Sequence, residues 1–221
     1  MSTPRGLVVA KAPVPGFAKT RLAARVGAHN AAELAAAALL DTLAAVADAF
    51  GECHLALAGD VDDACRSDEI RAAVASWHVF AQEGTTFGDR LAHAHRVVAG
   101  CGPGPVVQVG MDTPQVTASV LAAAVDELRP GGGVLGPAED GGWWLLGLDD
   151  PTAADVLPDV VMSTDRTGSD TRRALAGRGV ALATTTTLCD VDTIEDAEAV
   201  ALVAPLTRFA TAWSALGCEV S

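Results

Sequence analysis

Short apolar runs alternate with segments of helical periodicity along the first part of the chain. Runs with the length of buried strands occupy residues 7–10, 54–58, 77–81 and 106–109. Helical patterns follow at residues 30–50, 62–76, 87–99 and 117–128. Asn30 and Glu33 have the spacing of a capping box for the first of these helices. Repeated strand–helix units predict an α/β fold in which a mostly parallel sheet carries helices on both faces.

The pattern changes at the consecutive glycines 131–133. Two strand-like pieces, at residues 134–136 and 143–148, flank Asp140-Gly141-Gly142 and predict a hairpin or a tight reversal. The remaining patterns are helical at residues 170–176, β-type at 180–188 and helical again at 195–216. Neither a linker nor an internal repeat interrupts the sequence, so we expect one domain over residues 1–221.

Composition narrows the classes of partner. The 221 residues include 15 Lys and Arg against 28 Asp and Glu, which gives a net charge of −13. Binding to nucleic acids or anionic membranes depends on clustered cations, so we expect neither. Scattered cysteines without C-x-x-C spacing, and the lack of an apolar run long enough to span a membrane, predict a reduced cytoplasmic protein without a membrane span. The oligomeric state stays open, a homodimer included.

One basic segment stands out in this acidic chain: Lys11-Ala-Pro-Val-Pro-Gly-Phe-Ala-Lys-Thr-Arg-Leu22. Its prolines and glycine exclude a continued strand or helix, so its backbone amides can face a ligand. Lys11, Lys19 and Arg21 supply charge and hydrogen-bond donors for a polyphosphate. The alternative is a solvated basic turn, but the position between a buried strand and a helix favours a phosphate loop. The segment does not match the Walker pattern G-x-x-x-x-G-K-[ST].

Carboxylates lie at the ends of two other β-type runs. Asp112 follows the apolar run at residues 106–109, and Asp190 and Asp192 follow the run at 180–188. Carboxylates from different strand ends, opposite a polyphosphate loop, can hold Mg²⁺ or Mn²⁺ through hard oxygen ligands. The alternative for whichever of Asp190 and Asp192 misses the metal is a cap on the following helix. His93 and His95 fall on different faces of a helical pattern and do not form a zinc pair.

Two further segments have donors or acceptors for a substrate. The first, residues 82–91, can contact a nucleobase or ribose, although it also has ordinary helix-start chemistry. The second, residues 139–143, can bind an acceptor or simply form a turn. Trp143 and Trp144 alternate in a strand pattern, so one of them is expected in the core.

These motifs together resemble the bacterial DUF2064 family, often labelled "glycosyltransferase". The resemblance rests on K-x-P-x-x-G-x-x-K-T-R-L at 11–22, G-x-D-x-P at 110–114, residues 136–142 and Asp190-Val191-Asp192-Thr193. It implies a single-domain, three-layer α/β/α fold of the GT-A-like nucleotide-diphospho-sugar transferase superfamily, with a mostly parallel central sheet. The first loop is also similar to that of 2-phospholactate and molybdenum-cofactor guanylyltransferases. Met111 and Trp143-Trp144 depart from the family pattern.

The resemblance assigns roles to numbered residues. The catalytic residues would be Lys19, Arg21 and Asp112. The nucleotide site would include Ala10, Lys11, Pro13, Gly16, Lys19, Arg21, Gln82, Gly84, Gly88 and Arg90. Asp112, Asp190 and Asp192 would hold Mg²⁺ or Mn²⁺. Glu139, Asp140, Gly141, Gly142 and Trp143 would bind the acceptor.

Three functions remain open from the sequence. The first is nucleotidyl transfer from a nucleoside triphosphate to a small phosphorylated or anionic acceptor, which suits the three cations of the loop. The second is glycosyl transfer from a nucleotide-sugar, with Glu139 or Asp140 as an acceptor base. The third is a nucleotide-binding domain without turnover. One fold can host all three, so the fold alone does not choose among them.

Overall fold

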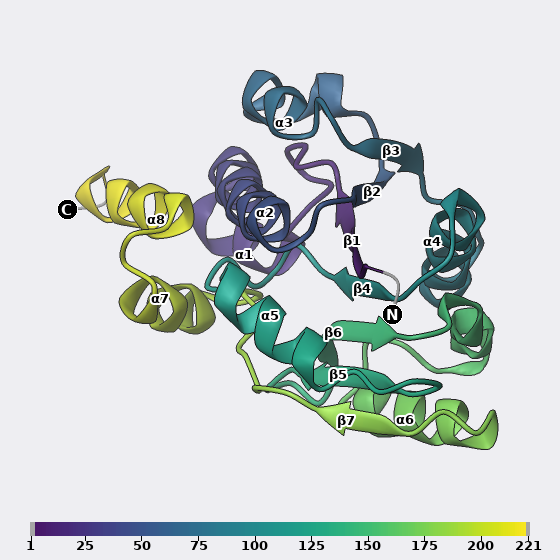
Figure 1. The fold of residues 1–221 in the computed structure, drawn as a ribbon. Coiled ribbons are helices and arrows are strands. Elements are labelled where there is room, and N and C mark those ends of the chain that lie inside the picture. Colours follow the sequence, from purple (N-terminus) through teal and green to yellow (C-terminus); the bar gives the residue numbers. More distant parts are fainter. Residues whose placement is uncertain (1–2, 220–221) are drawn as a thin grey trace.

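The computed structural model describes residues 3–219, and its centre is a seven-stranded sheet (Figure 1). Its strands are β1 (Arg5–Lys11), β2 (Cys53–Ala58), β3 (His78–Ala81), β4 (Val106–Val109), β5 (Gly133–Pro137), β6 (Trp143–Leu148) and β7 (Leu182–Thr184). They lie in the order β3-β2-β1-β4-β6-β5-β7, and β6 runs antiparallel to both of its neighbours. The expected parallel core and the β5–β6 reversal are confirmed.

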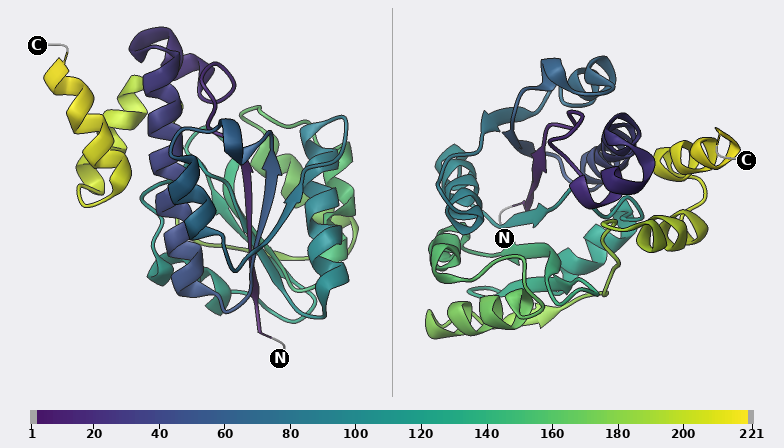
Figure 2. Two further views of the ribbon diagram at one scale, coloured as in Figure 1. Left: turned by 90° about the horizontal axis from the view of Figure 1, so that it is seen from above. Right: turned by 180° about the vertical axis from the view of Figure 1, so that it is seen from behind.

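Helices cover both faces of the sheet, as Figure 2 shows from two further sides. They are α1 (Thr20–Val26), α2 (Ala28–Ala49), α3 (Ser67–Ala73), α4 (Phe87–Cys101), α5 (Ala118–Asp126), α6 (Thr167–Gly177), α7 (Ile194–Val203) and α8 (Arg208–Glu219), with 3₁₀ turns η1 (Val61–Asp63) and η2 (Pro151–Asp159). Side chains of α2, α3 and α5 form the core on one face, and those of α4, η2 and α6 form it on the other. The predicted three-layer α/β/α architecture is confirmed.

A third apolar cluster joins α7 and α8 to α1 and α2, away from the sheet (Figure 2). Buried Asp41 of α2 accepts hydrogen bonds from the backbone amides of Arg208 and Phe209, at 3.1 and 2.9 Å. A carboxylate at the start of a helix satisfies amides that lack intrahelical partners. Asp41 therefore fixes where α8 begins.

Helix α2 is long and apolar enough to cross a membrane by length and composition. However, 72% of its most apolar window is buried inside the protein. Its alanine-rich faces allow close packing against both the sheet and the third cluster. We therefore describe α2 as a core helix.

Three local expectations are wrong. Asn30 and Glu33 do not form a capping box, because α2 already begins after Gly27 and Glu33 pairs with Arg66 at 3.0 Å. The helix expected at 62–76 is split into η1 and α3, because Arg66 adopts a left-handed conformation with φ of 54°. The β-type run at 180–188 forms a strand only over Leu182–Thr184.

Buried His95 of α4 makes stability sensitive to acid. Its Nε2 lies 3.1 Å from Oε1 of Gln108, and burial lowers its pKa from 6.5 to about 4 despite that hydrogen bond. The unfolded chain takes up this proton below about pH 6.5 and the folded chain only near pH 4, so stability falls by up to about 3 kcal/mol across that window.

We expect His95→Gln to lose less unfolding free energy between about pH 7 and 4 than wild type, measured by urea denaturation. Exposed His29→Gln is the matched control, and equal pH dependence in wild type and His95→Gln would contradict the assignment.

Candidate functional site

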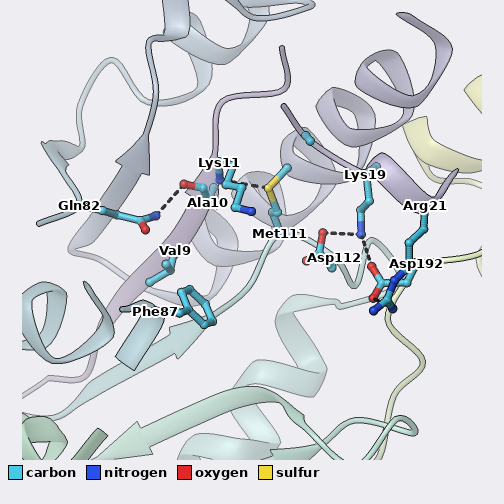
Figure 3. A pocket seen from close by; sticks show the side chains of 11 residues that line it. Val9, Ala10, Lys11, Lys19, Arg21, Gln82, Phe87, Met111, Asp112 and Asp192 are labelled. Carbon is cyan, nitrogen blue, oxygen red and sulfur yellow. Dashed lines mark hydrogen bonds and ion pairs between the residues drawn. The ribbon is translucent and has the colours of Figure 1, made fainter. Parts of the chain in front are cut away.

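The three cations of the basic segment at 11–22 and two of the predicted carboxylates meet in one cavity at the carboxyl ends of β1 and β4 (Figure 3). Strand order reverses between these two strands, and such switch points are where open α/β sheets bind ligands. The cavity has a volume of about 240 Å³. Its lining consists of Val9, Ala10, Lys11, Ala18, Lys19, Arg21, Gln82, Phe87, Met111, Asp112 and Asp192.

The loop after β1 is held in place by backbone hydrogen bonds. Ala12 donates to the Ala58 carbonyl at 2.7 Å, and Cys65 donates to the Pro13 carbonyl at 3.0 Å. Gly16 has a φ of 82°, a conformation that side chains rarely adopt. Lys19 itself is left-handed, with φ of 51°, where the loop turns into α1. The loop therefore has a defined path that delivers Lys19 to the cavity.

The Lys19 ammonium occupies the space between two carboxylates (Figure 3). Its Nζ lies 2.6 Å from Asp112 Oδ1 and 3.2 Å from Asp192 Oδ1, and it also donates to the Val191 carbonyl. The Lys19 side chain is only 6% exposed. Burial alone would lower the pKa of Lys19, but the ion pairs with Asp112 and Asp192 raise it by more. The pKa of Lys19 therefore lies above its usual value. Lys19 is therefore charged when the site is empty.

Residues 189–192 reach the site because they dock on the turn after β4. Val191 N donates to the Asp112 carbonyl at 2.8 Å, and Gln115 Nε2 donates to the Cys189 carbonyl at 2.7 Å. Helix α7 is capped instead by Thr193 and Asp196, which form a capping box. The helix-cap alternative for Asp190 and Asp192 is therefore wrong, and both carboxylates face cavities.

A second cavity of about 450 Å³ adjoins the first, and the two share five lining residues, among them Arg21, Asp112 and Asp192. Its other lining residues are Val9, Phe87, Gln108, Gly110, Thr113, Asp140, Gly142, Trp143, Trp144, Met162, Ser163, Thr164, Asp165, Thr167 and Asp190. Burial, followed by the charges of Asp112 and Asp140, raises the pKa of Asp190 to about 7, against the opposing effect of Lys19. Burial and the neighbouring carboxylates thus both disfavour the charged form of Asp190, and Lys19 offsets them only in part.

The predicted nucleobase segment reaches the first cavity only in part. Gln82 lines the cavity, and its Nε2 braces β1 and β2 by donating to the carbonyls of Ala10 and Ala56, at 2.7 and 3.0 Å. Gly88 instead packs against η2, since a Cβ there would lie 2.3 Å from the Leu157 carbonyl oxygen. Arg90 lies over the Phe87 ring, 5.7 Å from its centre. Neither Gly84, Gly88 nor Arg90 lines either cavity.

Of the other predicted site residues, some line a cavity and some do not. Asp140, Gly142 and Trp143 line the second cavity, whereas Glu139 and Gly141 do not. Pro13 and Gly16 shape the first loop without lining either cavity. Trp144 is 2% exposed, which confirms that one tryptophan of the pair belongs to the core.

Sequence reasoning missed the segment from Met162 to Asp165, which forms a wall of the second cavity. Ser163 has a φ of 61°, and Thr167 Oγ1 holds the turn by accepting from Thr164 N at 3.0 Å. Gly141 allows the close approach of this segment, because a Cβ there would lie 2.1 Å from the Asp165 carbonyl oxygen. The available signal was the polar run Ser-Thr-Asp-Arg-Thr just before α6.

Comparisons with known proteins agree with this architecture. The family model DUF2064, described as an uncharacterized protein conserved in bacteria, matches residues 40–164. No curated protein matches the sequence significantly. A solved structure of a candidate nucleotide-diphospho-sugar transferase from Desulfovibrio desulfuricans G20 is 26% identical, with a TM-score of 0.83 over 99% of this chain and 95% of that one.

Two more distant structures share the fold. A nucleotidyl transferase from a Methanothermobacter species is 14% identical, with a TM-score of 0.62 over 90% of this chain and 96% of that one. A 4-diphosphocytidyl-2C-methyl-D-erythritol synthase from Anaerococcus prevotii DSM 20548 is 11% identical, with a TM-score of 0.56 over 98% of this chain and 96% of that one. The expected nucleotide-diphospho-sugar transferase-like fold is confirmed.

The position of Lys19 predicts how the site responds to a divalent cation. We expect Lys19→Met to remove the ion pair of Asp112 and to leave Asp192 with Arg21 alone, and so to lower stability by about 1–2 kcal/mol in EDTA. Added Mg²⁺ should raise the melting temperature of Lys19→Met more than that of wild type, because the cation can then neutralise the freed carboxylates. Differential scanning calorimetry with and without Mg²⁺ measures both effects.

The matched control for this comparison is Arg25→Met, which removes an exposed cation of α1 outside both cavities. It should respond to Mg²⁺ like wild type. Equal Mg²⁺ responses of Lys19→Met and Arg25→Met would contradict the assigned role of Lys19.

Proposed function

This chain belongs to the DUF2064 family, and we propose that it is a metal-dependent transferase that uses a nucleotide-activated donor. The favoured reaction is nucleotidyl transfer from a nucleoside triphosphate to a small phosphorylated or anionic acceptor. One observation carries the proposal: cations from the loop after β1 and carboxylates from two separate segments line a single cavity at the switch point of the sheet. The transferase descriptions of the structural neighbours support the same reaction class.

The donor would bind in the first cavity. Lys11 and Arg21 are exposed cations on its wall. Arg21 is 77% exposed and pairs with Asp192 Oδ2 at 3.6 Å, and because this ion pair is solvent-exposed it does not prevent Arg21 from reaching phosphate oxygens. Lys19 is already shared by Asp112 and Asp192, so its proposed part is to position these carboxylates and to keep positive charge beneath the phosphates. Gln82 and Phe87 border the side of the cavity where a base or ribose would lie.

Asp112, Asp190 and Asp192 provide the oxygen ligands that Mg²⁺ or Mn²⁺ prefers. Burial, and after it the charges of Asp112 and Asp140, raises the pKa of Asp190, and a divalent cation would offset the contribution of these neighbouring charges. Held by these three carboxylates, the ion would supply positive charge against the donor phosphates during transfer. Lys19 keeps Asp112 and Asp192 in reach of that position.

The acceptor would bind in the second cavity, against Trp143, Asp140 and the segment from Met162 to Asp165. An acceptor oxygen there would attack the α-phosphorus of the donor, forming a new phosphorus–oxygen bond as the bond to pyrophosphate breaks. Lys11 and Arg21 would stabilise the departing pyrophosphate. The protein supplies position and charge in this scheme, and no covalent enzyme intermediate is needed.

Glycosyl transfer from a nucleotide-sugar is the second candidate. It is favoured by the description of the 26% identical structure and by the second cavity, whose volume of about 450 Å³ and aromatic wall at Trp143 suit a sugar. In that reaction a nucleoside diphosphate would leave, and Asp140 would accept the acceptor proton. A nucleotide-binding domain without turnover is the third candidate.

Calorimetric binding of the common nucleoside triphosphates and nucleotide-sugars, with Mg²⁺, Mn²⁺ or EDTA, tests the proposal. We expect one triphosphate to bind wild type in a metal-dependent manner and Asp112→Asn to lose that dependence. Incubation with candidate acceptors should then release pyrophosphate. Release of a nucleoside diphosphate would select glycosyl transfer, binding without release would select the non-catalytic reading, and binding of neither donor class would overturn all three.

Arg21 provides a sharper test of the donor orientation. We expect Arg21→Ala to weaken binding of the metal–nucleotide complex by about 1–3 kcal/mol, because charge-assisted hydrogen bonds to phosphate are lost. Arg25→Ala removes the same charge from the same helix outside both cavities, and should leave affinity within about 0.5 kcal/mol of wild type. An equal loss in both variants would mean that only the general charge of the helix matters.

A further inference from the structure

Three metal-ligating side chains meet at the amino ends of β2 and β3, at the edge of the sheet opposite the carboxylate cavities. His54 of β2 and His78 of β3 are register partners in adjacent parallel strands, so their side chains lie on one face of the sheet. Cys101 is the last residue of α4, which covers that face. One ligand atom from each of the three residues lies within 4.8 Å of the others.

The contacts within this cluster leave ligand atoms available. Cys101 Sγ lies 3.4 Å from His78 Nδ1, and the two histidine rings stand edge to face with centres 5.5 Å apart. His54 is 1% exposed, its Nε2 lies 2.9 Å from Glu52 Oε1, and its Nδ1 is buried without a hydrogen-bond partner. A buried polar atom without a hydrogen-bond partner costs free energy in the folded state, and a bound ligand would remove that cost.

Glu52 fixes the form of His54 that a metal needs. The Glu52 carboxylate can only accept a hydrogen bond, so His54 Nε2 carries the hydrogen in their 2.9 Å contact. In the neutral ring, Nε2–H donates to the Glu52 carboxylate and Nδ1 keeps its lone pair. A carboxylate behind a ligating histidine in this way orients the ring and raises its basicity.

The hollow around the cluster gives an ion access from solvent. It has a volume of about 540 Å³, and it is lined by all three ligands together with Glu52 and Trp77. His78 and Cys101 are exposed, so both side chains can rotate. Tetrahedral zinc ligands lie about 3.3–3.6 Å apart, and closing from 4.8 Å needs only such a rotation.

We propose that His54, His78 and Cys101 bind a zinc-type divalent cation at a site separate from the carboxylate cavities. Two imidazole nitrogens and one thiolate select Zn²⁺ or Co²⁺ over Mg²⁺ and Mn²⁺, which prefer oxygen ligands. Binding releases the Cys101 thiol proton. The thiolate and the Glu52 carboxylate then balance the two positive charges of the ion, and the fourth coordination position faces the hollow.

Co²⁺ titration of the full chain after EDTA treatment tests this site directly. We expect one Co²⁺ per chain to give thiolate-to-cobalt charge-transfer absorption in the near ultraviolet and tetrahedral d–d bands, both abolished by added Zn²⁺, whereas Co²⁺ held by the oxygen ligands of the carboxylate cavities gives no thiolate band. Cys101→Ser should remove the charge-transfer band. Cys65→Ser, a thiol outside the cluster, should leave the band unchanged. Glu52→Gln should weaken binding by about 10–100-fold while keeping the spectrum, as expected for a residue that orients a ligand.

Asp112→Asn separates this site from the carboxylate cavities, because it should leave the cobalt spectrum intact. Circular dichroism of each variant verifies that it is folded, and His78→Gln provides a second exposed substitution that should weaken Co²⁺ binding by at least about tenfold. A wild-type protein without a thiolate–cobalt band, a band that survives Cys101→Ser, or a band lost in Asp112→Asn would each overturn the proposal.

Discussion

The buried ammonium of Lys19 connects three segments that are distant in the sequence. It pairs with Asp112 on the turn after β4 and with Asp192, and it donates to the carbonyl of Val191, 172 residues away. Backbone pairing of Val191 with Asp112 adds a second tie between the same segments. The Lys19 side chain is only 6% exposed, so moving either carboxylate away would leave its buried charge without a partner. This cost holds the three segments together. Residues of this junction line both cavities: Asp112 and Asp192 line the two of them, and Lys19 lines the first.

The part of the site that could be predicted from the sequence lies at strand ends. Lys11 and Arg21 follow a short apolar strand, and Asp112 follows another, so parallel pairing alone brings them to one edge of the sheet. The same reasoning recovered the sheet core and its helical layers, because strand length and helical periodicity are local properties. The sequence leaves open whether Asp190 or Asp192 caps the following helix, and the structure answers this because Thr193 and Asp196 form the capping box of α7 and leave both aspartates facing the cavities.

The remaining features depend on tertiary contacts that leave no periodic pattern. The wall from Met162 to Asp165 is irregular backbone held against Gly141 by close packing, so neither hydrophobic spacing nor turn chemistry places it at the cavity. His54 and Cys101 come together through the register of β2 with β3 and the length of α4. The sequence suggests only His93 and His95 as a histidine pair, because they lie two residues apart in the chain. Asn30 failed as a cap because the unusual φ of Gly27 starts α2 earlier.

Charge balance constrains what can enter the carboxylate cavities. Lys19 is already shared by Asp112 and Asp192, and Asp190 lies close to the further negative charge of Asp140, which contributes to its raised pKa. A nucleotide would add negative charge to this wall, which costs free energy unless carboxylates take up protons or a cation enters with the ligand. A divalent cation removes the repulsion and can join phosphate oxygens to the carboxylates. If the proposed nucleotide binds here, the acidic side of the site would therefore favour a metal–nucleotide complex over the free nucleotide, and Lys11 and Arg21 on the same lining would be the cations that meet its phosphates.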